Sequence, residues 1–397
     1  GVTQFRDEKT ASVQNYLPTM IPQLDYILGG GLPFGRMVEQ IGRPTSGKST
    51  AAVHYTKIAQ MMGVPVLWID VENTTEVSRM NQLGVDLSYG IYKVQPNQKK
   101  DKSTGELISE PMTIERVAEK LEKLTTYYKS MGEPIVIIWD SVSQTNSARE
   151  LERGVGDTMP GIQAKALTQF SKIVAPMIND SQTLFIAINQ ARDEMGSMFG
   201  GIDSSGGNAF KHWASLRLEV KKRGKIEEDV PDAFGGHSKE YVGHIMGIRT
   251  IKSKVSTPNR NADMYLMAES GLDIEENVYR AALAPNKQYS LISGGTWRKY
   301  TTLDGEEIKF NSNLKWVNYL KSEEGHATLV ELFGRMMAIS FPNGYAPFNS
   351  EQVDIRNIPL YNEIGEDYMN KFSPDNKKEP KKEAQSKEDV DEMVDQV

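Results

Sequence analysis

The sequence predicts an α/β protein that is built on a mainly parallel, twisted β-sheet with a P-loop ATPase core. After residue 21, short apolar runs alternate with helical patterns, as expected when helices connect the strands of a parallel sheet. Two runs, IVIIWD (135–140) and TLFIAIN (183–189), are continuously apolar, which is typical of strands covered on both faces. A third observation is the motif GRPTSGKS (42–49), which lies between a predicted strand and a predicted helix.

The elements follow in a regular order. RMVEQI (36–41) and PVLWID (65–70) are predicted strands, and the segment between them (49–62) is a predicted helix. A second, amphipathic helix is predicted where apolar residues recur at helical spacing: Ile114, Val117, Ala118, Leu121 and Leu124. Three later runs have few helices between them and predict an antiparallel edge to the sheet: 215–220, 245–251 and 262–268. Residues 97–110 are expected to form an exposed excursion.

Four segments are expected along the chain. Residues 1–20 form a short N-terminal segment, and residues 21–292 form the core of the chain. A smaller C-terminal α+β domain is predicted over 293–372, with helices at 313–321 and 328–339. Residues 373–397 hold five lysines and eight acidic residues, so we expect a disordered acidic tail.

Composition narrows the functional classes. The 397 residues include no cysteine, which excludes disulfides and thiolate metal sites and fits a reducing cytoplasm. The five histidines form no ligand-spaced pair. No apolar run is long enough to span a bilayer and no signal-peptide pattern opens the chain, so no membrane partner is expected. The net charge of −7 does not by itself indicate a nucleic-acid-binding protein.

The GRPTSGKS motif predicts a nucleotide site. In a loop of this kind, backbone N–H groups and the start of the following helix face the phosphates of ATP. Lys48 supplies a cation, and the Ser49 hydroxyl binds Mg²⁺. The alternative is a chance glycine-rich turn. The residues expected to bind the nucleotide here are Gly42, Arg43, Pro44, Thr45, Ser46, Gly47, Lys48 and Ser49.

Two carboxylates complete the predicted ATPase site. Asp140 ends an apolar run, where it can hold Mg²⁺ through water, although acids at strand ends also cap helices. Glu72 lies two residues beyond PVLWID and can accept a proton from an attacking water. The alternative is that Asp70 or Glu72 only caps a helix that begins near Thr74.

The stretch MFGGIDSSGGNAF (198–210) follows the apolar run and its terminal Asn-Gln pair, 189–190. Ordering so many glycines costs backbone entropy, and loops at strand ends usually carry function. Together with IPQLDYILGGGLPFGRMVEQIGRPTSGKST, WIDVE, IIWDSV and IAINQ, this stretch resembles the RecA family of recombinases over roughly residues 20–270. The chain is similar to the bacterial members through the core and to phage UvsX-type members in overall design, which implies the cytoplasm of a bacterial or phage-infected cell.

The resemblance implies roles for particular residues in ATP hydrolysis. Thr50 joins the phosphate loop, Glu72 matches the catalytic glutamate and Asp140 the magnesium aspartate. Gln190 matches a glutamine that senses the γ-phosphate and tethers a DNA-binding loop. Lys252 and Lys254 match a lysine pair that reaches the γ-phosphate of the neighbouring subunit; without the family they would be a solvated strand edge.

The resemblance also implies two DNA-binding loops, 152–161 and 198–210. After the first loop, Lys165, Thr168 and Lys172 share one helix face, opposite Phe170, Ile173 and Met177; a solvated polar face is the alternative. Contacts of this kind bind phosphates without reading bases and depend strongly on salt. The DNA-binding residues implied at and around the second loop are Arg192, Met198, Phe199, Gly200, Ser204, Ser205, Gly206, Gly207, Asn208 and Lys211.

Several residues depart from the family pattern. The resemblance implies that residues 21–292 are the ATPase and DNA-binding core and that residues 1–20 are a remnant of an oligomerisation module, which is longer in the family. Arg79 stands where an adenine-stacking tyrosine is common, so its guanidinium is expected to stack on adenine instead. Pro160 stiffens the first loop, and Glu194 stands in the second loop where the family has a basic residue. These changes concern assembly and DNA affinity rather than the phosphate loop.

The expected function is that of an ATP- and Mg²⁺-dependent recombinase. It forms a helical filament on single-stranded DNA, pairs it with a homologous duplex and exchanges strands, with mediator and single-strand-binding proteins as further partners. One alternative is a hexameric helicase on the same core, which gives no reason for the Asn-Gln pair before the second loop. The other is a non-hydrolysing accessory protein that coats single-stranded DNA, against which the intact Lys48, Glu72, Asp140 and Gln190 argue.

Overall fold

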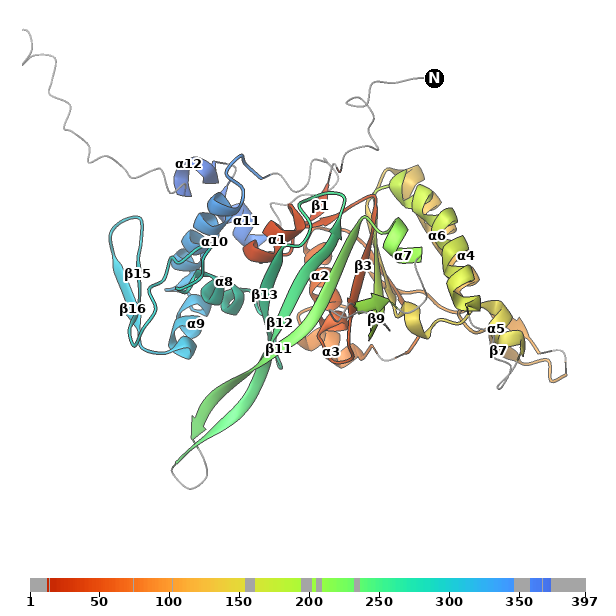
Figure 1. Ribbon diagram of the computed structural model, residues 1–397, viewed down its shortest axis with the longest axis horizontal. Helices are drawn as coiled ribbons and strands as arrows, with labels where there is room; N and C mark the ends of the chain where they lie inside the picture. Colours follow the sequence, from red (N-terminus) through yellow and green to blue (C-terminus); the bar gives the residue numbers. More distant parts are fainter. Residues whose placement is uncertain are drawn as a thin grey trace, which may run out of the picture.

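A ten-stranded β-sheet forms the centre of the computed structural model (Figure 1). The structure describes residues 13, 15–73, 75–101, 103–153, 161–193, 202–204, 209–231, 236–345, 358–365 and 367–372. The strands run in the order β14-β13-β12-β11-β3-β9-β8-β4-β5, and β10 (Ile202–Ser204) pairs with β9 beside this path.

The sheet has a parallel part and an antiparallel edge, as the sequence predicts. The parallel strands are β3 (Arg36–Gly42), β4 (Val66–Asp70), β5 (Ile91–Lys93), β8 (Ile135–Asp140) and β9 (Thr183–Asp193), joined by β11 (Leu216–Pro231), which is parallel to β3. The antiparallel edge adds β12 (His237–Ser253), β13 (Asn261–Met267) and β14 (Gly271–Leu272). The predicted α/β class is therefore confirmed.

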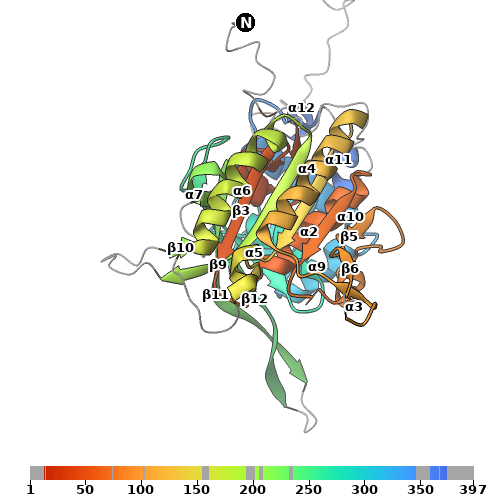
Figure 2. The same ribbon diagram turned by 90° about the vertical axis from the view of Figure 1, so that its right-hand side faces the viewer.

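Helices cover both faces of the sheet, which explains the continuously apolar strands. One face packs against α4 (Ile114–Met131), α6 (Ile162–Asn179) and α7 (Ala209–Trp213), with α4 and α6 side by side in Figure 2. Trp139, Phe170 and Phe185 meet in this layer, with the Trp139 and Phe170 ring centroids 5.2 Å apart. The opposite face packs against α1 (Pro22–Leu28) and α2 (Lys48–Met61), and α3 (Val77–Gln82) lies beside them.

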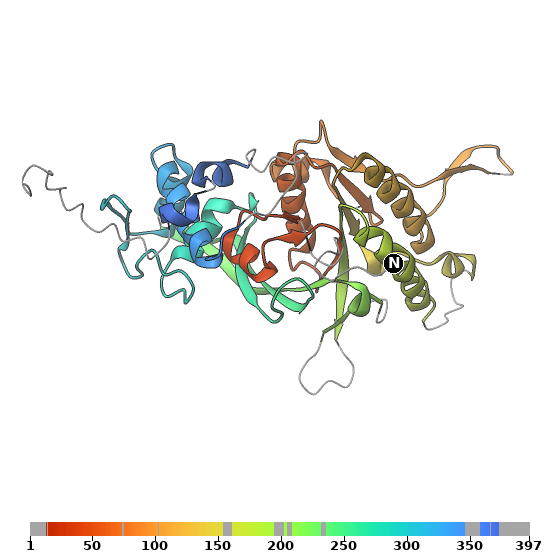
Figure 3. The same ribbon diagram turned by 90° about the horizontal axis from the view of Figure 1, so that it is seen from above.

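Two hairpins project from the body. Strands β11 and β12 continue beyond the sheet as a two-stranded ribbon, visible in Figures 1 and 2. Both strands are much longer than the predicted 215–220 and 245–251. The prediction stopped short because the ribbon is rich in charged side chains and shows no apolar run. The excursion at 97–110 contains a hairpin of β6 (Gln98–Lys100) and β7 (Leu107–Ser109), which projects from the body in Figure 3. The side chains of both strands are exposed.

The C-terminal part packs against α1 and the antiparallel edge. It contains α8 (Ile274–Ala282), β15 (Arg298–Thr301), β16 (Glu307–Phe310), α9 (Asn313–Lys321), α10 (His326–Ser340), α11 (Pro359–Ile364) and α12 (Tyr368–Phe372). Helices α9 and α10 lie where the sequence predicts them. One apolar cluster includes residues from both sides of position 292, and the domain boundary there stays a prediction. Among the helices that the structure describes, none is long and apolar enough to cross a membrane.

Candidate nucleotide and DNA site

The predicted ATPase residues gather at the carboxyl edge of the parallel strands. Gly42, at the end of β3, is in register with Gln190 on β9, and Asp70 of β4 is in register with Asp140 of β8. Parallel strands carry their ends to one edge, which is where α/β sheets bind ligands. Glu72 follows β4 at this same edge.

The phosphate loop requires glycine at both ends of its motif. A Cβ atom on Gly42 would lie 2.4 Å from the Val220 carbonyl oxygen and 2.7 Å from Ser46 Oγ. Gly47 has a φ of 98°, which side-chain-bearing residues rarely adopt. Arg43, Pro44 and Thr45 between them are exposed, with Thr45 at a φ of 59°.

Lys48 lies inside this loop. Its ammonium donates hydrogen bonds to the carbonyl oxygens of Gly42, at 3.0 Å, and Arg43, at 2.9 Å. Burial lowers the pKa of Lys48, and the carboxylates of Asp140 and Glu72 oppose that change. The cation is therefore held where the phosphates of a nucleotide would lie.

The residues of the loop fit an anion. In the described part of the chain no side chain caps α2 at Gly47, so the N–H groups of its first turn point toward the loop. Ser46 is 2% exposed, and its hydroxyl finds no hydrogen-bond partner among the described residues. A buried hydroxyl without a partner is costly, and a phosphate oxygen is an acceptor of the right chemistry for it.

Ser49 and Asp140 form the predicted magnesium pair. The Ser49 hydroxyl donates a 2.7 Å hydrogen bond to Asp140 Oδ2, and Asp140 is 8% exposed. Burial is the largest of the causes that raise the pKa of Asp140; Glu72 and Asp70 add to it, whereas the Ser49 bond and Lys48 oppose it. Among the described residues no three His, Cys, Asp or Glu side chains form a metal cluster. One carboxylate and one hydroxyl fit Mg²⁺, which is usually held by few protein ligands together with phosphate and water.

Glu72 is held by a serine rather than by a helix. Its Oε1 accepts a 2.5 Å hydrogen bond from Ser141 Oγ. Helix α3 begins at Val77, not near Thr74, and its N-cap residue is Glu76, so capping by Glu72 is wrong. Asp70 instead accepts a bond from the backbone N–H of Thr75 and pairs with Lys93 at 3.2 Å.

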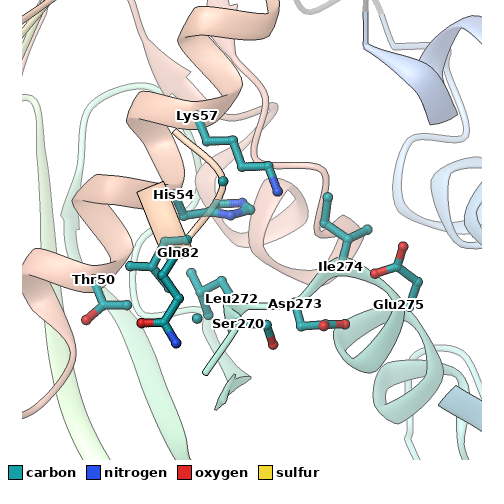
Figure 4. Close-up of a pocket in the computed structure, with 12 residues that line it drawn as sticks. Thr50, His54, Lys57, Gln82, Ser270, Leu272, Asp273, Ile274 and Glu275 are labelled. Atoms are coloured by element: carbon teal, nitrogen blue, oxygen red, sulfur yellow. The ribbon is translucent and has the colours of Figure 1, made fainter. Parts of the chain in front are cut away.

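Arg79, which the resemblance places at the adenine end of the nucleotide, is held by backbone and side-chain oxygens. Its guanidinium is exposed and donates to the carbonyl oxygens of Ala268 (2.7 Å) and Glu269 (3.2 Å) and to Gln82 Oε1 (2.8 Å). These bonds fix the guanidinium plane that is expected to stack on adenine; the stacking itself stays a prediction. A cavity of about 190 Å³ lies nearby, and Thr50 from the first turn of α2 lines it (Figure 4).

Gln190 is connected through its backbone to a buried hydrogen-bonded network around Glu39. Glu39 of β3 is fully buried; it accepts bonds from Asn189 Nδ2, at 2.9 Å, and Arg217 Nε, at 2.5 Å. The side-chain oxygen of Asn189 in turn accepts the backbone N–H of Gln190 at 2.9 Å. The start of the predicted second loop is thus anchored to the strand that leads into the phosphate loop.

The ammonium group of Lys252 is hydrogen-bonded to backbone atoms of its own chain. Its ammonium donates to the carbonyl oxygens of Lys211 (2.5 Å) and His212 (2.9 Å), near the end of α7, which follows the second loop. Burial, with the charges of Lys254 and Arg217, lowers the pKa of Lys252 to about 8. Lys254 is exposed. The action of this lysine pair on a neighbouring subunit stays a prediction.

The α6 part of the predicted DNA-binding surface lies within the described residues, whereas most of the two loops does not. Lys165, Thr168 and Lys172 are exposed, and Phe170 is buried on the opposite side, but Ile173 is 42% exposed and does not join the buried face. The side chains of Arg192 and Ser204 lie outside the described residues, as do most of the first loop and the following positions of the second: Met198, Phe199, Gly200, Ser205, Gly206, Gly207 and Asn208.

The polar residues that hold the site were not predicted from the sequence. Ser141, Asn189 and Arg217 each act through a partner that is distant in sequence, so no local pattern indicates them. One signal was available: Glu39 is a carboxylate inside an otherwise largely apolar run, and a buried charge requires a partner.

Comparison with known proteins agrees with this geometry. A family model described as the RecA N-terminal domain matches residues 1–273. Protein RecA of Thermotoga petrophila is 31% identical over 328 residues, covering 82% of this chain and 83% of that protein. Protein RecA of Francisella tularensis subsp. tularensis is 30% identical over 349 residues, covering 87% and 86%. The chain therefore belongs to the RecA family of recombinases.

Proposed function

We propose that this protein is a DNA-stimulated ATPase that forms a filament on single-stranded DNA and catalyses homologous pairing and strand exchange. The observation that carries the proposal is the convergence of Lys48, Glu72 and Asp140 at one sheet edge, beside Gln190. Gln190 starts the loop that the sequence predicts to bind DNA, so the ATPase site and the DNA site share an element.

Each residue has a part in hydrolysis that its geometry supports. Lys48, the uncapped start of α2 and the Ser46 hydroxyl bind the phosphates, while Ser49 and Asp140 would hold Mg²⁺, which neutralises charge on the phosphate oxygens. Glu72 accepts the proton of the attacking water. The side-chain amide of Gln190 binds the γ-phosphate. When hydrolysis removes the γ-phosphate, this contact is lost, the second loop changes and DNA binding weakens.

DNA binding is proposed to be sequence-independent. Lys165, Thr168 and Lys172 are proposed to contact phosphates from α6, together with residues of the two predicted DNA-binding loops. Lys252 and Lys254 are proposed to act on the ATP of the neighbouring subunit, which makes hydrolysis depend on the filament. Base pairing between the two DNA molecules then supplies all sequence specificity.

Strand exchange is the direct test. The protein is incubated with ATP, Mg²⁺, a labelled single strand and a duplex that is either homologous or unrelated, and the labelled product is separated on a gel. The proposal predicts labelled duplex only with the homologous partner, and none with Lys48→Ala. Unwinding of both duplexes regardless of homology would identify a helicase and refute the proposal.

A further inference from the structure

A chain of hydrogen bonds leads to Glu72 from the turn that follows β8. Ser141 is 2% exposed, and its hydroxyl donates to Glu72 Oε1 at 2.5 Å. The Ser143 hydroxyl lies 3.1 Å from Ser141 Oγ. A hydroxyl has one proton, and a carboxylate only accepts, so the Ser141 proton goes to Glu72 and Ser143 must donate to Ser141. The direction of the chain is therefore fixed.

The turn that carries both serines is rigid. The backbone carbonyl oxygen of Ser141 accepts a 2.9 Å bond from Thr145 Oγ1, which in turn accepts the indole N–H of Trp139 at 2.9 Å. Trp139 and Thr145 are fully buried. The position of the Ser141 hydroxyl is thus set by the core and not by solvent.

The same turn is tied to the helix that follows the first predicted DNA loop. Gln163, in the first turn of α6, donates its side-chain amide to the carbonyl oxygens of Thr145, at 3.0 Å, and Ser143, at 3.4 Å. Helix α6 begins at Ile162, directly after the loop, and presents Lys165 and Thr168 to solvent. A shift of the start of α6 would therefore move the turn to which Ser141 and Ser143 belong.

We infer that Ser141 is a positioning residue for the Glu72 carboxylate, and that Ser143 and Gln163 link its position to the DNA-binding face of α6. This inference rests on the proposed function, because it takes Glu72 as the base. It adds a route from the first loop to the ATPase site that is separate from Gln190. Glu72 is exposed, so without the serine its carboxylate would sample several rotamers.

The test measures kcat and KM for ATP with and without single-stranded DNA, together with the Kd of a fluorescent ATP analogue. Ser141→Ala is expected to lower kcat about tenfold or more, because a misplaced catalytic group is costly, with KM and Kd within about twofold. Ser143→Ala should lower kcat by about threefold, since it removes only the second donor. Ser141→Thr keeps the hydroxyl and should retain more activity than Ser141→Ala.

Gln163→Leu tests the link to DNA. It should leave turnover without DNA within about twofold and lower the DNA-stimulated rate by about threefold or more. Ser171→Ala is the control on the same helix: this serine is buried on α6, and its hydroxyl has no hydrogen-bond partner among the described residues, so both rates should be unchanged. An equal loss of both rates in Gln163→Leu would overturn the link.

The outcomes separate this inference from the proposed function. If Glu72→Gln retains turnover, Glu72 is not the base and the proposed mechanism fails. If Glu72→Gln is inactive while Ser141→Ala keeps a normal kcat, the proposed mechanism stands and the positioning role of Ser141 is refuted. A fall in kcat for both variants, with nucleotide affinity retained in Ser141→Ala, supports both.

Discussion

Replacing Arg217 with Met removes the cationic partner of Glu39, a carboxylate that has no access to water. Glu39 is 0% exposed, the Arg217 side chain is 9% exposed, and Nε and Oε2 are 2.5 Å apart. Breaking such a pair from one side costs about 3–5 kcal/mol, because the remaining charge stays buried. Against a total stability of roughly 5–15 kcal/mol, this is a large fraction. Asn189 would still donate to Glu39, which places the expected loss toward the lower end.

Urea denaturation followed by tryptophan fluorescence measures this loss. Arg217→Met should lose about 3 kcal/mol of unfolding free energy, and the double variant Glu39→Gln/Arg217→Met should recover at least half of it, since no charge is then left buried. Lys299→Met is the control: its pair with Glu307 is nearly half exposed on both sides and should matter by less than about 1 kcal/mol. An Arg217→Met variant within about 1 kcal/mol of the native protein would refute the reasoning.

Three further predictions concern the nucleotide, DNA and pH. Lys48→Ala should abolish ATP turnover while the far-UV circular dichroism stays native; unaltered turnover would remove Lys48 from the phosphate site. Lys165→Ala/Lys172→Ala should weaken single-strand binding in a fluorescence titration and reduce the salt slope by roughly 0.7 for each phosphate that is no longer bound; an unchanged slope would make these lysines a solvated face. Burial holds the pKa of His54 at about 4 against an ordinary 6.5. As the pH falls, His54 is therefore protonated in the unfolded chain before it is protonated in the folded protein. Its neutral form contributes about 3 kcal/mol to the free energy of unfolding above pH 6.5, and this contribution is lost toward pH 4. The difference in unfolding free energy between the native protein and His54→Gln should shrink over that range, and a constant difference would contradict this.

The sequence was sufficient for the layered core. Strands such as Ile135–Asp140 are buried on both faces, so their apolar runs are unbroken and their bounds can be predicted. The GRPTSGKS turn was equally predictable, because its motif is contiguous in sequence and Gly47 meets a local requirement, a φ of 98°. Local chemistry of this kind is written in adjacent residues.

Features that depend on distant partners were not predictable to the same degree. The long ribbon of β11 and β12 pairs with itself and buries few side chains, so it leaves no apolar pattern. Ser141 meets Glu72 across 69 positions, and Arg217 meets Glu39 across 178. Helical spacing alone predicts Ile173 on the side of α6 away from the lysines, but the core of this layer does not extend far enough to cover it.

The buried network of Glu39, Asn189 and Arg217 anchors the chain just before the predicted second DNA-binding loop. Asn189 binds Glu39 on the strand before the phosphate loop, and Lys252 holds the end of the helix after the second loop. Both stems of the loop are therefore anchored to strands of the central sheet. The γ-phosphate contact proposed for Gln190 would therefore act on a segment that is held at both ends.

ATP turnover in the absence of DNA, with single strands and with duplex, at low and high salt, tests the central claim most directly. The coupling of the ATPase edge to the predicted DNA loops requires strong stimulation by single strands and its loss at high salt. Turnover that is the same under all three DNA conditions would contradict the account, because Gln190 and the α6 face would then transmit nothing to Glu72.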